Sequence, residues 1–152
     1  MDNSLMMEFK GGKQLEKALL ALPQALRGEI LQETLVAGAD PVRADAANRA
    51  RMHRGPRRRP ETIALAESIR IFLGAKDDTH AIVDVGTNKP TAHLVEFGHR
   101  EVVGDQVIGQ VPAYPFLRPA FDENKEEMLQ RIGEVMGKEI ESTFRRLAPQ
   151  ER

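Results

Sequence analysis

Three side chains with metal-binding chemistry lie close together in the sequence, namely His93, Glu96 and His99. Imidazole and carboxylate groups are common zinc ligands. On a helix His93 and Glu96 would share a face, but His99 follows Gly98 and would point elsewhere. Helical zinc motifs instead place two histidines four residues apart, with a glutamate between them. We therefore interpret these residues as structural polar groups near a turn and predict no metal site.

A hydrolase triad could be assembled on paper from Ser68, either His80 or His93, and Asp84. Such a triad needs a nucleophile elbow or a glycine-rich oxyanion loop, and the sequence has neither. The short run Gly11–Lys13 also lacks the glycine spacing of a phosphate-binding loop. The sequence therefore predicts no enzyme, no catalytic residue and no cofactor.

A basic loop at residues 53–61 is the most unusual charged feature. Pro56 and Pro60 exclude regular structure there. Four side chains are candidates for contact with a partner protein or DNA: Arg54, Arg57, Arg58 and Arg59. Contact with phosphate or an acidic protein surface is one interpretation. A solvated loop that follows a helix C-terminus is the other, and both remain open.

The segment Val111–Phe121 contains three prolines, which restrict the backbone to an extended path into a helix start. Tyr114, Phe116 and Leu117 offer apolar anchors along it. The segment could be a rigid connection on the chain's own core, an anchored surface at a subunit boundary, or both.

Three helices are expected to position these residues. Apolar spacing predicts a short helix around Leu15–Leu22 that ends at Pro23. A second helix runs from Gln24 to about Met52, with a kink or a restart at Pro41 for which Asp40 could be the new N-cap. A long amphipathic helix is predicted over about residues 119–147.

The strand signals are shorter. We expect a strand at Leu5–Lys10 and an antiparallel pair formed by Ser68–Leu73 and His80–Gly86. Thr91–Phe97 reads as a helical turn. Valines and glycines in Glu101–Val111 predict a projecting hairpin within a loop over residues 99–112.

Bulk composition suits a single domain over residues 1–152, with 41% hydrophobic and 30% charged residues. The net charge of −1 gives no global attraction to nucleic acid or membrane. There are no cysteines, no secretory-type N-terminus and no apolar run of membrane-spanning length. We expect a soluble protein that is made inside the cell.

Two motifs carry a family resemblance: Ala92–Gly98 and, later, Pro115–Ala120. With Leu19–Pro23 and Leu65–Ile69 in the same order, the chain resembles, over about residues 12–147, the tail-component family of long-tailed bacteriophages and prophages. These are also called head–tail joining, neck or tail-completion proteins. Members usually carry Thr where this chain has His99, and a shorter, less basic loop where it has Arg54–Arg59.

The resemblance implies an α+β fold: a small, mostly antiparallel sheet packed by two long helices, with a projecting hairpin. It also implies a non-enzymatic virion protein, made in the host bacterial cytoplasm, that joins the capsid portal complex to the tail as a hexameric or dodecameric ring. Its partners would be copies of itself, other neck, connector and tail proteins, and non-specifically the DNA in the channel, with no membrane. The subunit-interface candidates are Glu96, Phe97, Tyr114, Phe116 and Arg118.

Two alternatives remain. The chain could be a tail terminator or another minor tail protein. It could instead be a DNA-contacting accessory protein that uses the arginine loop, and a salt-dependent gel shift would separate that function from a purely structural one.

Overall fold

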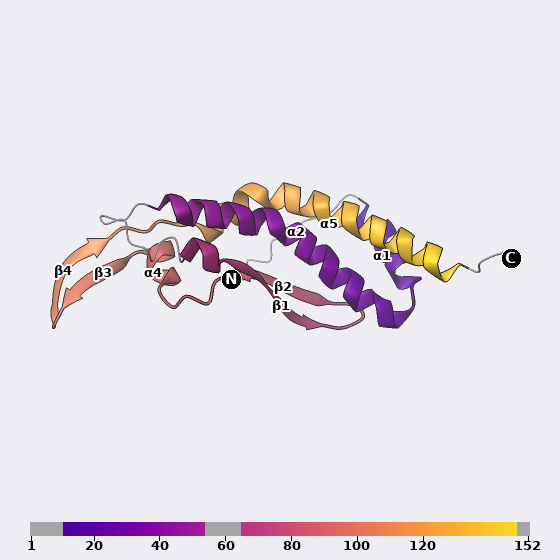
Figure 1. Ribbon diagram of the computed structural model, residues 1–152, viewed down its shortest axis with the longest axis horizontal. Coiled ribbons are helices and arrows are strands. Elements are labelled where there is room, and N and C mark those ends of the chain that lie inside the picture. Colours follow the sequence, from indigo (N-terminus) through magenta and orange to yellow (C-terminus); the bar gives the residue numbers. More distant parts are fainter. Residues whose placement is uncertain (1–10, 54–64, 149–152) are drawn as a thin grey trace. The chain divides into compact units, whose positions relative to one another are not determined.

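A computed structural model describes residues 11–53 and 65–148 of the chain. The predicted strand at Leu5–Lys10 and the arginines Arg54, Arg57, Arg58 and Arg59 lie outside these described residues. The elements, in chain order, are α1 (Gly12–Leu20), α2 (Gln24–Met52), β1 (Arg70–Lys76), β2 (Ala81–Gly86), α4 (Ala92–Phe97), β3 (His99–Val103), β4 (Gln106–Val111) and α5 (Leu117–Leu147) (Figure 1). The predicted α+β class is confirmed.

The strands form two separate two-stranded antiparallel sheets, β1–β2 and β3–β4, rather than one small sheet. The sequence predicted the first pair as an antiparallel hairpin, and it predicted a projecting hairpin or a long loop in the region of the second. In the first pair the turn is closed by the N–H of Asp77, which donates to the carbonyl of His80 (2.8 Å). The Asp77 carboxylate in turn accepts from the backbone N–H groups of Thr79 and His80, and these bonds lower the pKa of Asp77.

The sequence predicted a kink or a restart of α2 at Pro41, with Asp40 as a possible new N-cap. The helix does not restart there, because it continues from Gln24 to Met52 with Pro41 inside it. A proline inside a helix removes one hydrogen bond and costs about 3 kcal/mol. Burial on both sides of it offsets that cost, since Ala39 and Val42 are both buried. Asp40 instead accepts two hydrogen bonds from Arg43 (2.8 and 3.0 Å).

Helix α5 begins at Leu117, two residues before the predicted start at Pro119. Proline is tolerated in the first turn of a helix, where its missing N–H would have no partner within the helix. Arg145 and Arg146 occupy the last turn, where their positive charges interact favourably with the negative end of the helix dipole. No acidic residue lies in the first turn, so the acids that begin at Asp122 do not cap the helix.

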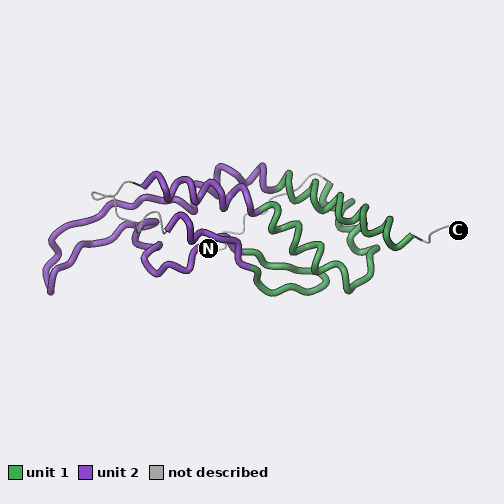
Figure 2. The backbone as a smooth tube through the Cα atoms, viewed as in Figure 1, with its two compact units in different colours: residues 1–38, 73–83, 129–152 green, residues 39–72, 84–128 purple. Residues whose placement is uncertain are grey.

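The chain divides into two compact units, each with its own buried cluster (Figure 2). The first unit comprises residues 1–38, 73–83 and 129–152, and its core contains Leu19, Leu22, Ile30 and Ile140. The second comprises residues 39–72 and 84–128. Its core is larger and rich in alanine, with Val42, Ala46, Ala47, Ala50, Leu65, Ala66, Ile69, Ala92, Phe116 and Ala120. The prediction of one domain over residues 1–152 stays a prediction.

Within the described ranges, no helix combines the length and apolar character that crossing a membrane requires.

Candidate assembly interface

The carboxylate of Glu96 caps the N-terminus of α5 from a distance of about twenty residues along the chain. Its Oε2 accepts hydrogen bonds from the backbone N–H groups of Phe116 (2.8 Å) and Leu117 (3.0 Å). Its Oε1 accepts from the N–H of Arg118 (3.1 Å). The first N–H groups of a helix have no partner within the helix, and the next residue, Pro119, has no N–H at all. Glu96 therefore satisfies every free donor from Phe116 to Pro119.

This cap is also an electrostatic contact. Glu96 is only 8% exposed, and a buried carboxylate is costly unless it is paired or hydrogen-bonded. Here its charge faces the positive end of the α5 dipole as well as the three N–H groups. Glu96 thus supplies the negative charge that an acidic residue in the first turn of α5 would otherwise provide. We call Glu96 and the N–H groups of Phe116, Leu117 and Arg118 the anchor.

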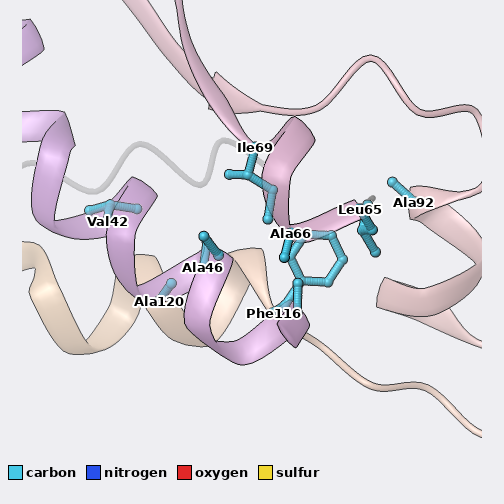
Figure 3. Close-up of a cluster of buried hydrophobic side chains, with 10 residues drawn as sticks. Val42, Ala46, Leu65, Ala66, Ile69, Ala92, Phe116 and Ala120 are labelled. Carbon is cyan, nitrogen blue, oxygen red and sulfur yellow. The ribbon is translucent and has the colours of Figure 1, made fainter. Parts of the chain in front are cut away.

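Phe116 begins the anchor and also fills the core of its unit. Its side chain is completely buried. Figure 3 shows the ring beside Ala66 and Leu65, and Ala46 and Ala120 belong to the same buried cluster. The alanines of α2 are small enough to let the aromatic ring approach the helix closely. One residue thus fixes the start of α5 through its backbone and the core through its side chain.

Gly98 presses the end of α4 against the segment that leads to the anchor. Its φ is +72°, a conformation that side-chain-bearing residues adopt only at a cost. A Cβ at this position would lie 2.6 Å from the Val111 carbonyl oxygen and 2.7 Å from the Ala113 nitrogen. The N–H of Tyr114 then donates to the Val95 carbonyl (2.7 Å). Together these contacts fix the base of the β3–β4 pair, where β3 leaves α4 and β4 returns.

Tyr114 and Phe97 are exposed aromatic side chains near the anchor. Phe97 is 76% exposed and Tyr114 is 36% exposed. The Tyr114 ring lies 4.5 Å from the ring of His53, centroid to centroid, with the planes tilted by 42°. Both aromatic rings therefore offer surface that the core of this unit does not use.

The β3–β4 hairpin carries an aliphatic surface that the described residues of its own unit leave more than half exposed. Four side chains on it are between 52% and 64% exposed: Val102, Val103, Val107 and Ile108. Val102 and Val107 are direct cross-strand partners, so they share a face. The two-residue turn has φ of +61° at Gly104, as a type II′ hairpin requires. We call residues 99–111 the contact hairpin.

The contact hairpin is bent by a bulge. Glu101 pairs with Gly109, and the next residue, Val102, pairs with Val107, so Ile108 is the extra residue of β4. A bulge bends the strand and increases its local twist. The sequence predicted a projecting hairpin here, but neither the bulge nor the exposure of each side chain follows from the residue pattern.

The structure brings together three of the five predicted interface residues, Glu96, Phe116 and Arg118, in the anchor. Glu96 and the Phe116 side chain are buried within their own unit, whereas Arg118, Phe97 and Tyr114 are exposed. Contact of these five residues with another subunit stays a prediction. Sequence reasoning missed Gly98, although a glycine directly after a short helix signals a positive φ.

The arginines that precede the basic loop have partners within the chain. Arg49 donates to Asp45 (3.1 Å) and also bonds the Glu123 carboxylate of α5. The hydrogen bond with Asp45 is the largest cause that raises the pKa of Arg49. Arg43 is paired with Asp40, and Arg51 with the side-chain oxygen of Asn48 (3.2 Å). These three guanidinium groups therefore serve the fold.

The candidate catalytic side chains have other partners. The Ser68 hydroxyl bonds the Leu65 carbonyl (2.7 Å) and the Thr87 hydroxyl (2.5 Å). His80 lies beside Asp77 and Thr79 in the β1–β2 turn. In the described part of the chain, no group of three or more His, Asp or Glu side chains could hold a metal ion.

A groove of about 240 Å³ lies in the first unit. It is lined by Leu26, Glu29, Ile30, Glu33, Glu139, Thr143 and Arg146. Thr143 accepts a hydrogen bond from Arg146 (3.1 Å), so the arginine is held at the rim. The walls combine two aliphatic side chains with three carboxylates but present no reactive group.

A protein-family model with the description "Bacteriophage HK97-gp10, putative tail-component" matches residues 13–98. The matched region runs from α1 to Gly98, so the contact hairpin and α5 follow it. Searches of curated proteins and of solved structures found no match to the chain.

Proposed function

This chain belongs to the HK97-gp10-like family of bacteriophage tail components, and from that premise we propose that it acts at the head–tail junction, as a ring that joins the portal complex to the tail. The family supports a structural, tail-related role in a phage particle. The resemblance of Ala92–Gly98 and Pro115–Ala120 to neck and tail-completion proteins supports the narrower position.

The observation that carries the proposal is the exposed aliphatic surface of the contact hairpin. Isolated exposed apolar residues are common on proteins, but a cluster of four on one two-stranded hairpin favours contact with another protein. The base of this hairpin is fixed by Gly98 and by the bond between Tyr114 and Val95. A surface held in this way is pre-organised, so docking costs less conformational entropy.

A ring requires a head-to-tail contact that closes by rotation. Such a contact uses two different surfaces on each copy. In our proposal the two edges of the contact hairpin belong to these two surfaces, and the exposed residues Phe97, Tyr114 and Arg118 near the anchor add to the contact. Other neck and tail proteins would then bind the two faces of the ring.

Electron microscopy of particles from the phage or prophage that encodes the chain, with its gene deleted, tests this function. Filled heads beside free, finished tails would support a joining role. Tails of abnormal length would indicate a tail terminator instead, because tube growth would lack its stop. Normal infectious particles would overturn the structural function altogether.

A further inference from the structure

The contact hairpin has two open edges. β3 pairs with β4 and with no other strand in the described part of the chain. Each strand therefore presents a row of unpaired backbone N–H and C=O groups on its outer side, which is a template for another strand. A two-stranded hairpin alone is marginally stable in water, and a third strand adds substantially to it.

The outer edge of β4 lacks two of the usual protections against pairing. Soluble proteins block edge strands with charged side chains, with proline or with a bulge. β4, from Gln106 to Val111, has the bulge at Ile108 but contains no charged residue and no proline, and most of it is exposed. All the formal charge within the two strands lies on β3, at Arg100 and Glu101.

We propose that β4 of one copy pairs antiparallel with β3 of the next copy, so that successive hairpins form one continuous sheet. This inference rests on the proposed ring and identifies the contact that closes it. In a ring, the hairpins of all copies point the same way around the rotation axis. β4 of one copy then lies beside β3 of the next, and the two strands run in opposite directions. The pairing between copies is therefore antiparallel, like that within each hairpin.

Charge favours a second copy as the occupant. At one level the row of side chains would read Arg100, Gln110, Arg100, Gln110, following the pairing within each hairpin. At the next level Glu101 alternates with Gly109. A neutral residue therefore separates every two like charges, which avoids the penalty for like charges on directly opposed positions. Val102 and Val107 alternate in a further row and form a continuous aliphatic stripe.

The bulge also favours a second copy. β4 carries two residues against one on β3 at Ile108, and this bends the hairpin. A straight strand from an unrelated protein would not follow that bend. The β3 strand of another copy belongs to a hairpin with the same bend, so it can follow the outer edge of β4. One such edge buries less than the roughly 800 Å² per partner of a standard interface, so we expect the contact to form in the assembled ring.

The first test replaces Val107 with lysine and supplies the variant in trans to a phage that lacks the gene. Val107 is 59% exposed, so V107K folds like the parent protein, while a charge enters the aliphatic row at every copy. We expect infectious titre to fall roughly tenfold or more. The matched control is L147K, because Leu147 is 51% exposed at the end of α5. Equal titres for V107K and L147K would overturn the inference.

The second test uses the absence of cysteine from the sequence. One copy carries R100C and a second copy, of different size, carries Q110C. The two are co-expressed, and the assembled particles are oxidised. A disulfide between the unlike copies supports pairing of β3 with β4, since neighbouring strands bring the two positions within disulfide reach. Disulfides between like copies only, or no disulfide at all, would overturn it.

The two tests and the gene deletion separate failure of the inference from failure of the proposed function. If deletion of the gene leaves normal particles, the proposed function fails. If deletion is harmful but both tests fail, only the edge pairing is wrong.

Discussion

The anchor and the contact hairpin are neighbours in the chain, yet they use their residues in opposite ways. At the anchor the Glu96 carboxylate is buried, and beside it the Phe116 ring is fully buried and Gly98 is tightly packed. In the contact hairpin, four aliphatic side chains are exposed, and no other described strand pairs with its outer edges. The difference separates the residues that hold the fold from those available for contact. Substitutions in the anchor should therefore reduce folding stability, whereas substitutions in the hairpin should reduce assembly.

The largest effect is expected for Phe116→Ala. The side chain is completely buried among alanines and Leu65, and its removal leaves a cavity that rigid helices fill poorly. We expect the free energy of unfolding to fall by about 3–5 kcal/mol, measured by denaturant titration. A loss below about 1 kcal/mol would mean that the ring does not support this core, and the comparison between anchor and hairpin would break down.

The next effect is expected for Glu96→Ala. This change leaves the N–H groups of Phe116, Leu117 and Arg118 without their acceptor, and one of them is buried. A lost hydrogen bond to a charged group costs about 1.5–3 kcal/mol, so we expect a loss near the top of that range. Glu96→Gln is the matched control, because it keeps one carbonyl oxygen and should lose about half as much. Equal losses for the two variants would contradict the account of the cap.

Gly98 and Gly104, which both have a positive φ, sharpen the comparison between the regions. Gly98→Ala creates both backbone strain and a clash with Val111 and Ala113, whereas Gly104→Ala creates strain alone, since nothing lies within 4 Å of its added Cβ. We expect the free energy of unfolding to fall by about 1–2 kcal/mol for Gly104→Ala and by clearly more for Gly98→Ala. Thermal unfolding of both variants checks the order. The reverse order would show that the base of the hairpin is not closely packed.

The smallest effect on folding is expected for the double variant Val102→Ser with Val107→Ser. Both side chains are more than half exposed, so little buried apolar surface is lost. We expect a change below about 1 kcal/mol in the free energy of unfolding, with a clear defect in complementation of a deleted phage. A destabilised monomer would place these valines in the fold and remove them from the contact surface.

Much of this arrangement could be predicted from local patterns. Apolar periodicity located α1, α2 and α5, strand signals located β1 and β2, and valines around two glycines indicated a hairpin or a long loop at β3 and β4. The continuous path of α2 through Pro41 could not be predicted, because tertiary burial outweighs the local penalty for proline. The partners of Arg49 also escaped prediction, because Glu123 lies 74 residues away along the chain.

The anchor was only partly predictable. The sequence singled out Glu96, Phe116 and Arg118, since their motifs resemble those of a known family, but it did not indicate that a carboxylate caps a helix twenty residues later. It also gave Phe116 as an interface candidate, while the structure buries the side chain within its own unit. Whether a side chain is buried depends on which elements pack together in three dimensions, and the spacing of residues in a single sequence does not show that.

Hydrogen exchange of the free protein and of assembled particles tests the central claim most directly. Amide protection is compared for two segments, 99–111 and 112–120. We predict that the amides of Phe116, Leu117 and Arg118 are protected in both states, because Glu96 already binds them within the chain. The hairpin amides should gain protection only in particles, as their outer edges become paired or covered. Equal exchange of the hairpin in free and assembled protein would contradict the account.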